Sequence, residues 1–220
     1  SWVLATSTTI SSGGQETILT GGVSTSAVIL NGGRQTVSGV TSSSIVSSGG
    51  QQIVASGGLT SATRVSSGGQ QIVSSGGTGS ATIVFGGGSA TVSSGGTVSG
   101  MVISGGSATL SAGAVASGTT ILSGGVETVL SGATDSGAII SNGGQQIVSG
   151  TAVDAQVQSG GKQIAIGAAA SVSGTVISAG GTLVLSNFFA THSPILLSGG
   201  FIDLPGLTFV SSGNARLNGG

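Results

Sequence analysis

The sequence predicts an all-β fold, a right-handed parallel β-helix (β-solenoid) with about 11 coils of roughly 19 residues each. Gly-Gly doublets recur along the whole chain, and two columns of aliphatic residues keep a fixed distance from them. The segments in between, such as residues 70–74, are short, rich in β-branched residues and bounded by glycine, as strands are. A helix with this many glycines would lose roughly 1 kcal/mol per glycine relative to alanine, so a helical repeat is excluded.

The doublets set the period of the repeat. They begin at positions 13, 32, 49, 68, 87, 105, 124, 143, 160, 180, 199 and 219, so that successive starts lie 17 to 20 residues apart. In stacked coils, equivalent positions lie about 4.8 Å apart, and 11 periods therefore predict a rod about 53 Å long. Glycine supplies the positive φ that a tight corner needs.

Two aliphatic columns are expected to form the core. The fourth residue after each doublet gives Ile18, Val37, Val54, Val73, Val92, Leu110, Val129, Val148, Ala165, Leu185 and Leu204. The third residue before each doublet gives Ile10, Ile29, Val46, Val65, Val84, Val102, Ile121, Ile140, Val157, Ile177 and Leu196, and only Arg216, before the last doublet, breaks this column. At roughly 1.5–3 kcal/mol for each buried side chain, such columns stabilise an elongated core without a globular one.

The elements of one coil follow in a fixed order: a strand, a tight corner, an arc of small residues, a second strand and the next doublet. Glycines such as Gly57 and Gly58, eight residues after a doublet, mark the corner. Glutamines follow several doublets, as at residues 51–52, 70–71 and 145–146, and stacking predicts amide ladders there. The third position after each doublet, which holds Thr17 and Ile53 among others, alternates with the buried column and should face outward.

The regularity divides the chain into two parts. Residues 1–186 are expected to be regular solenoid repeats, and residues 187–220 to be degenerate coils that form a cap or a junction to a further domain. The second part holds His192 and both prolines, Pro194 and Pro205. The start at Ser1 and the end on a doublet suggest a processed product or a piece of a longer protein.

Composition excludes several classes of function. Of the 220 residues, 45 are Gly, 41 Ser and 24 Thr, whereas only four are Lys or Arg and five are Asp or Glu. Four basic residues provide no footprint for nucleic acid and no polybasic patch for a membrane surface. No apolar run approaches the roughly 18 residues of a membrane span, and there is no cysteine. We therefore expect no nucleic-acid partner, no direct membrane insertion, no cofactor and no metal.

The few ionisable residues do not form a catalytic site. Glu16 and Glu127 share a repeat position but are six periods apart, about 29 Å, whereas paired-carboxylate glycoside chemistry needs about 5–10 Å. Asp135 and Asp154 are one repeat apart and could be neighbours, with solvation at a corner as the favoured role and cation binding as the alternative. His192 is the only histidine and lies in the irregular tail. The sequence therefore predicts a protein that is not an enzyme.

An apolar stripe is the candidate interaction face. Several apolar residues flank the second buried column and would be exposed if the solenoid is two strands wide there, while burial under a third strand or a neighbouring domain is the alternative. This possible self-association face comprises Val28, Leu30, Ile83, Phe85, Met101, Ile103, Ile195 and Leu197.

The repeat units resemble those of AIDA-type autotransporter adhesins. The segments SGGQQIV at 48–54 and SGGQQIVSSGG at 67–77 carry the resemblance, which covers roughly residues 10–186. It implies a secreted β-helical passenger on the bacterial cell surface. Some members of that family carry heptose on Ser or Thr of these repeats, and the residues in comparable places are Ser47, Ser48, Ser66, Ser67, Ser74 and Ser75.

Three functions compete. The leading hypothesis is a structural or adhesive bacterial surface protein that mediates adhesion, self-association, or biofilm or filament formation, with a second copy or a host or neighbouring cell surface as partner. The second is an ice-binding β-solenoid, because threonines such as Thr91 and Thr109 repeat on one face. The third is a polysaccharide-active β-helix enzyme, for which the chain has too few acidic and basic residues.

Overall fold

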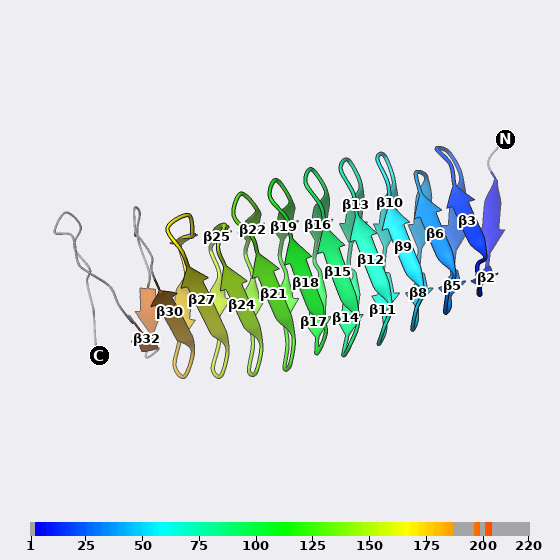
Figure 1. Ribbon diagram of the computed structural model, residues 1–220. Coiled ribbons are helices and arrows are strands. Elements are labelled where there is room, and N and C mark those ends of the chain that lie inside the picture. The colour runs from blue at the N-terminus through cyan, green and yellow to red at the C-terminus, as the bar shows by residue number, and fades with distance from the viewer. Residues whose placement is uncertain (1–2, 187–195, 199–200, 204–220) are drawn as a thin grey trace.

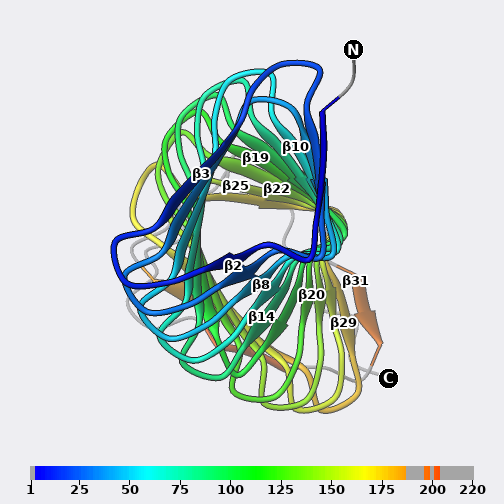
Figure 2. The same ribbon diagram turned by 90° about the vertical axis from the view of Figure 1, so that its right-hand side faces the viewer.

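The chain forms a β-solenoid (Figure 1), and the computed structural model describes residues 3–186, 196–198 and 201–203 of it. These residues form strands and turns and no helix. Each coil contributes one strand to each of three parallel sheets, which we call A, B and C. Seen from the N-terminal end, the chain runs clockwise as it recedes (Figure 2), so the solenoid is right-handed, as predicted.

Sheet C contains the strands that follow the doublets. In β3 to β30 the second and fourth residues point into the rod, as the alternating burial of β9 shows. Its 11 strands are β3 (Gln15–Ile18), β6 (Arg34–Val37), β9 (Gln51–Val54), β12 (Gln70–Val73), β15 (Ser89–Val92), β18 (Ser107–Leu110), β21 (Val126–Val129), β24 (Gln145–Val148), β27 (Lys162–Ile166), β30 (Thr182–Ser186) and β32 (Phe201–Asp203).

Sheet B contains the strands that precede the doublets. They are short, and their inward residues form the second core column. Its 11 strands are β2 (Thr9–Ile10), β5 (Val28–Ile29), β8 (Ile45–Val46), β11 (Arg64–Val65), β14 (Ile83–Phe85), β17 (Val102–Ser104), β20 (Thr120–Ile121), β23 (Ile139–Ile140), β26 (Gln156–Val157), β29 (Val176–Ser178) and β31 (Leu196–Ser198).

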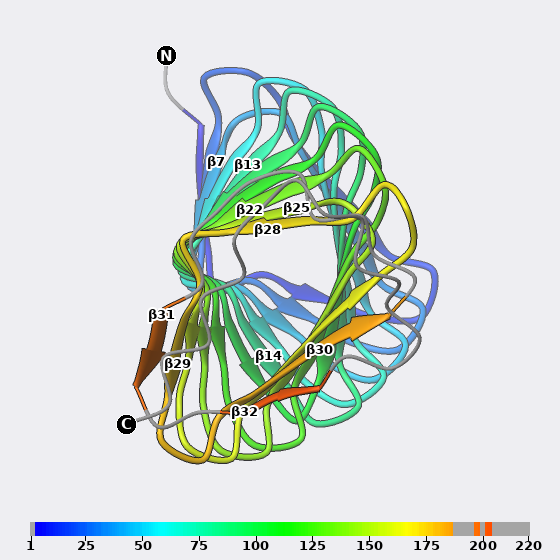
Figure 3. The same ribbon diagram turned by 90° about the vertical axis from the view of Figure 1, so that its left-hand side faces the viewer.

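Sheet A is the part that the sequence analysis described only as an arc of small residues. Each arc is a three-residue strand whose middle residue points inward, and a two-residue corner, whose first residue has positive φ, joins each of these strands to sheet B. The ten strands are β1 (Leu4–Thr6), β4 (Val23–Thr25), β7 (Val40–Ser42), β10 (Leu59–Ser61), β13 (Thr78–Ser80), β16 (Thr97–Ser99), β19 (Val115–Ser117), β22 (Thr134–Ser136), β25 (Thr151–Val153) and β28 (Ser171–Ser173). Figure 3, from the C-terminal end, shows sheets A, B and C as the three sides of the rod.

Both aliphatic columns are buried where the structure describes their side chains, with one exception. Val102 was expected in the second column, but Ile103 occupies that place: it pairs with Val84 and is fully buried. The turn between β17 and β18 is one residue shorter than the turn between β14 and β15. In this coil the buried residue therefore lies two residues before the doublet instead of three. In backbone register Leu197, rather than Leu196, pairs with Ile177.

The uneven period has a simple structural cause. Four residues separate Val54 from Leu59 in the turn from sheet C to sheet A, but only two separate Val37 from Val40. The doublets at 32 and 49 are accordingly 17 residues apart, and all three sheets still keep their pairing across this coil. The turn from C to A therefore absorbs the differences in length.

The two glycines of a doublet are needed for different reasons. Gly87 has φ +75°, a left-handed conformation, and a Cβ on it would lie 2.7 Å from Ser67 Oγ of the preceding coil. Gly88 has an ordinary φ, but its Cβ would lie 2.6 Å from the carbonyl oxygen of Val65. The turns can stack at strand spacing only because both positions lack a side chain.

The corners between sheets A and B store backbone strain. Ala62 and Ala81 have φ of +53° and +51° there, whereas other coils place glycine at this corner, as at Gly100 and Gly118. A non-glycine residue in this conformation costs about 1–2 kcal/mol, and the flexibility of glycine in the unfolded chain offsets about half of that.

We expect the double variant Ala62→Gly/Ala81→Gly to be more stable than the wild type by about 1 kcal/mol, because glycine relieves the left-handed strain at both corners. Thermal melts followed by circular dichroism should show Tm higher by about 2–4 °C. Ala112→Gly is the control, since Ala112 is a turn alanine whose own φ is not positive, and it should not raise Tm. An unchanged or lower Tm for the double variant would mean that the corners are not strained.

Candidate functional site

The outward face of sheet B carries an apolar stripe, though not with all the residues that the sequence predicted. Val28, Leu30 and Ile83 are half-buried there, and Phe85 is 37% exposed. Ile195 lies outside the described residues, and for Leu197 only the backbone is described. Met101 and Ile103 were expected on this face, and the structure places them in the core, with exposures of 1% and 0%.

The two errors have separate causes. The short turn after β17 moves Ile103 into the buried column, as described above. Met101 follows the left-handed corner at Gly100, and in every coil from Ala27 onward the residue after this corner is buried. The residues that the sequence analysis missed are in register with Val28 and Ile83 on the outward face. They are Ile45, Val102, Ile139 and Val176.

Serines line the turns on both edges of sheet C. Of the six serines singled out from the sequence, Ser48, Ser67 and Ser75 are exposed, and each immediately precedes a turn glycine with positive φ. Ser47, Ser66 and Ser74 are half-buried. Other exposed serines in the equivalent turn position were missed, and these are Ser12, Ser56, Ser94, Ser123, Ser131 and Ser159.

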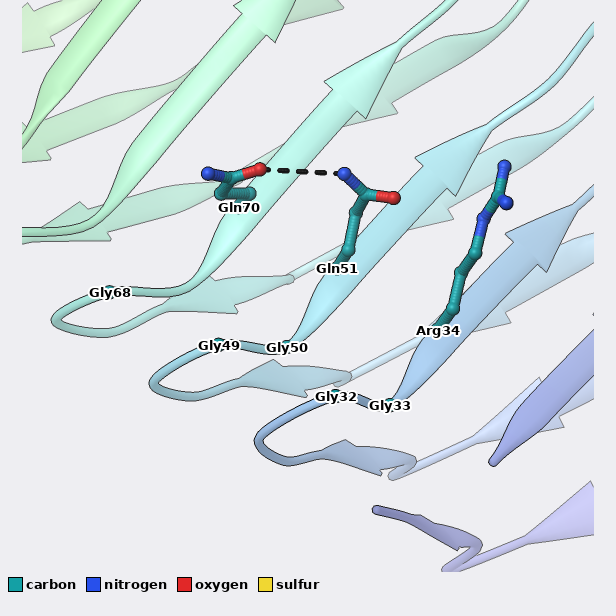
Figure 4. Close-up of a pocket in the computed structure, with 8 residues that line it drawn as sticks. All are labelled: Gly32, Gly33, Arg34, Gly49, Gly50, Gln51, Gly68 and Gln70. Atoms are coloured by element: carbon teal, nitrogen blue, oxygen red, sulfur yellow. Dashed lines mark hydrogen bonds between the residues drawn. The ribbon is translucent and has the colours of Figure 1, made fainter. Parts of the chain in front are cut away.

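A shallow open depression runs over the turns between sheets B and C, with a volume of about 310 Å³. Its floor is made of doublet glycines from three successive coils, among them Gly49 and Gly68 (Figure 4). The side chains of Arg34, Gln51 and Gln70 stand along it, and Gln51 Nε2 donates a hydrogen bond of 3.4 Å to Gln70 Oε1. The depression offers one cation and two amides and no nucleophile or general base.

Besides the exposed amide pair of Gln51 and Gln70, the rod holds a buried amide ladder in its interior. This ladder lies on the inward side of sheet C. Gln52 Nε2 donates to Gln35 Oε1 at 2.7 Å, and Gln71 Nε2 donates to Gln52 Oε1 at 2.8 Å. Hydroxyls from the other walls complete the ladder, as Thr63 Oγ1 does by donating to Gln52 Oε1 at 3.1 Å. All four residues are buried. The predicted ladders are therefore present both outside and inside the rod.

Every amide of the interior ladder donates toward the N-terminus, so each run of amides needs an acceptor at its N-terminal end. Gln35 Nε2 donates to Glu16 Oε2 at 2.6 Å, and Gln146 Nε2 donates to Glu127 Oε2 at 2.9 Å. A carboxylate has no amide protons that would themselves require an acceptor. Glutamate thus begins both runs, and the alanines at the two preceding ladder positions, Ala90 and Ala108, separate the runs.

Glu127 lies beside a second carboxyl group inside the rod. Asp135 reaches the interior from the middle of β22, and its Oδ2 accepts from the same Gln146 Nε2 at 2.7 Å. Glu127 is 0% and Asp135 1% exposed. Three buried oxygens at this point of the described chain accept or donate no hydrogen bond. They are Glu127 Oε1, Asp135 Oδ1 and the nearby Thr119 Oγ1.

Burial is the main cause that raises the pKa of both carboxyl groups. The negative charge of Asp135 raises the pKa of Glu127 further, whereas the hydrogen bond from Gln146 lowers it. The hydrogen bond from Gln146 also lowers the pKa of Asp135, but the effect of burial is larger.

The arrangement corrects one expectation from the sequence. Asp135 and Asp154 do not occupy equivalent positions: Asp135 pairs in register with Ala152 and is buried, whereas Asp154 is exposed at a corner with φ +54°. The neighbour of Asp135 is Glu127, eight residues earlier, just as Ser24 lies eight residues after Glu16 and donates to it at 3.3 Å. His192 lies outside the described residues.

Neither a metal cluster nor a membrane-spanning helix is found in the described residues. No three His, Cys, Asp or Glu side chains among them come together. Nor does this part of the chain contain a helix of the length and apolarity needed to cross a bilayer.

The fold and its ladders define the class: this is a β-solenoid repeat protein with a stacked amide interior. Among solved structures it matches the TibC-catalysed hyper-glycosylated fragment of TibA, with 36% identity and a TM-score of 0.78, over 92% of this chain and 84% of that one. The chain therefore belongs to the TibA family, and the match supports the resemblance to AIDA-type autotransporter adhesins.

An alginate lyase from Paenibacillus sp. str. FPU-7 matches over 92% of each chain with 13% identity and a TM-score of 0.27, which is too low to support any inference about this chain. No protein-family model matches the sequence. No curated protein matches it significantly.

Proposed function

We propose that this chain is the rod of a bacterial cell-surface adhesin, which acts outside the cell in adhesion, self-association or biofilm formation. The observation that carries the proposal is the match to TibA over nearly the whole length of both chains. The surface fits this role, because the chain has only nine charged residues in 220, of which Glu127 and Asp135 are buried, so that little charge opposes contact with another neutral surface or a second copy. No catalytic role is proposed, since the carboxyl pair found among the described residues, Glu127 and Asp135, is buried inside the rod.

The stripe on sheet B is the surface that we assign to adhesive contact. Its outward residues repeat at strand spacing, so that a second copy laid alongside could form the same contact in coil after coil. Ile45, which is 38% exposed, and Ile83 lie in the same column on either side of Arg64. A single cation in the column leaves the stripe predominantly apolar.

Beads coated with the purified chain should aggregate or bind cells. The double variant Ile45→Asp/Ile83→Asp should reduce this aggregation or binding several-fold, because it places two carboxylates in the apolar surface that makes the contact. Thr78→Asp/Thr97→Asp is the matched control. It places two charges in neighbouring coils on the outward side of sheet A and should leave aggregation unchanged. If both variants aggregate equally, the stripe is not the surface of adhesive contact. Wild-type beads that bind neither cells nor each other would contradict the adhesive function.

We further propose that the exposed turn serines are O-glycosylated, because the TibA fragment is described as hyper-glycosylated by TibC. Incubation with TibC and its sugar donor should add mass to this chain. Replacing Ser48, Ser67 and Ser75 by Ala should lower the number of added sugars by up to three. Ser44→Ala, which removes a buried hydroxyl, should leave the number unchanged, and modification confined to half-buried serines would overturn the assignment.

Ice binding is the competing proposal, and one observation favours it. Thr91, Thr109 and Thr128 stack in register on the outward side of sheet C. The column is irregular, because Ile53 and Ile72 occupy it in other coils. A thermal-hysteresis measurement separates the two functions, since an adhesin rod should show none.

A further inference from the structure

The strongest unexplained feature of the molecule is the pair Glu127 and Asp135 in its interior. Two ionised carboxylates this deeply buried and this close would be strongly unfavourable, because neither burial nor mutual repulsion is compensated by a cation. Gln146 donates to one oxygen of each group. The other oxygen of each, Glu127 Oε1 and Asp135 Oδ1, lacks a donor.

No group packed around the pair can neutralise it. In register with Glu127 are Ala108 on β18 and Gln146 on β24. In register with Asp135 are Ala116 on β19 and Ala152 on β25. The adjoining corner contributes Thr119, whose hydroxyl faces both carboxyl groups. Among the described residues the two carboxyl groups are therefore the only titratable groups at this point of the interior.

We propose that Glu127 and Asp135 form a proton-binding site inside the rod, in which one proton held between the two carboxyl groups joins sheet C to sheet A. A single proton supplies the missing donor for one oxygen and removes one of the two negative charges. The remaining charge is stabilised by the amide of Gln146. A hard cation is the other candidate occupant, but it would need about six oxygen ligands, and in the described part of the chain only Glu127, Asp135 and Thr119 have unpaired buried oxygens at this point.

The site makes the stability of the fold depend on pH. In the unfolded chain both carboxyl groups ionise near pH 4, whereas the folded chain keeps a proton to a higher pH, because burial raises the pKa of both groups. The contribution to stability is complete below pH 4 and is lost as pH rises toward the pKa of the folded pair. Over that interval the folding equilibrium constant should fall about tenfold per pH unit for each retained proton.

The test measures proton uptake directly. The full chain, unfolded in urea, is refolded by dilution in weakly buffered solution at pH 6 with a pH indicator. The wild type should take up about one proton per molecule, and Glu127→Gln should take up none. Asp154→Asn, which removes an exposed carboxyl group and leaves the pair intact, should behave as the wild type.

Glu127→Gln should fold, because the amide that it introduces can donate to Asp135 in place of the proton; should it not fold, Asp135→Asn provides the same test. In parallel, urea midpoints from pH 4 to pH 8 should decrease with pH in the wild type and lie on a flatter curve in either variant. No uptake of protons by the wild type overturns the proposal. The same holds if calcium raises and chelator lowers the midpoint of the wild type but not of the variants, which would assign a cation to the site.

Discussion

Ile140→Ala should lower the free energy of unfolding by about 3–4 kcal/mol, within the range of about 2–5 kcal/mol found for buried isoleucine truncations. Ile140 is fully buried in β23, where coils on both sides stack against it through Ile121 and Val157. The close spacing of the coils prevents the walls from collapsing into the space that is left. Urea unfolding followed by circular dichroism measures the loss.

Ile139→Ala is the control for this experiment, because Ile139 is the preceding residue of the same strand and points outward, half-buried. Truncating it should cost less than about 1 kcal/mol. The two variants remove the same atoms from adjacent residues, so their difference reports which side of the strand faces the core. Equal losses would contradict the register of sheet B.

Gln52→Leu should destabilise the chain by about 3–5 kcal/mol, although it replaces a polar residue in the core by an apolar one of similar size. The substitution takes away the acceptor of the Gln71 amide and of the Thr63 hydroxyl, and the donor to Gln35. Each buried polar group that is left without a partner costs about 1–3 kcal/mol. Thermal and urea melts of the variant measure the sum.

Gln51→Leu is the comparison, since the hydrogen bond of Gln51 to Gln70 is exposed and 3.4 Å long. It should change stability by no more than about 0.5 kcal/mol. If Gln52→Leu were as mild as Gln51→Leu, the interior ladder would not contribute to the stability of the rod.

The sequence predicts the solenoid well because the signals that determine it are local and repeated. The doublets predict the turns, and the aliphatic columns predict two of the three walls. The third wall was missed as a sheet because its strands are only three residues long and rich in small residues, such as Val40–Ser42. Its pairing comes from the coils on either side and not from its own strand propensity.

The candidate sites were less predictable, for physical reasons that particular residues make clear. Ile103 was misplaced because one residue is missing from a turn, and an alternating strand then reverses which residues face inward. Met101 was misplaced because a single left-handed residue before it turns its side chain into the core. The pairing of Glu127 with Asp135 depends on two different walls facing each other, which no period in the sequence expresses.

The variable turn between sheets C and A has a consequence for how such rods diversify. Because coils with two, four or five residues at this point all keep their neighbours in place, foreign loops or whole modules grafted there should be tolerated. Decorations could therefore be added to one edge of the shaft, at any chosen level, without disturbing the shaft itself.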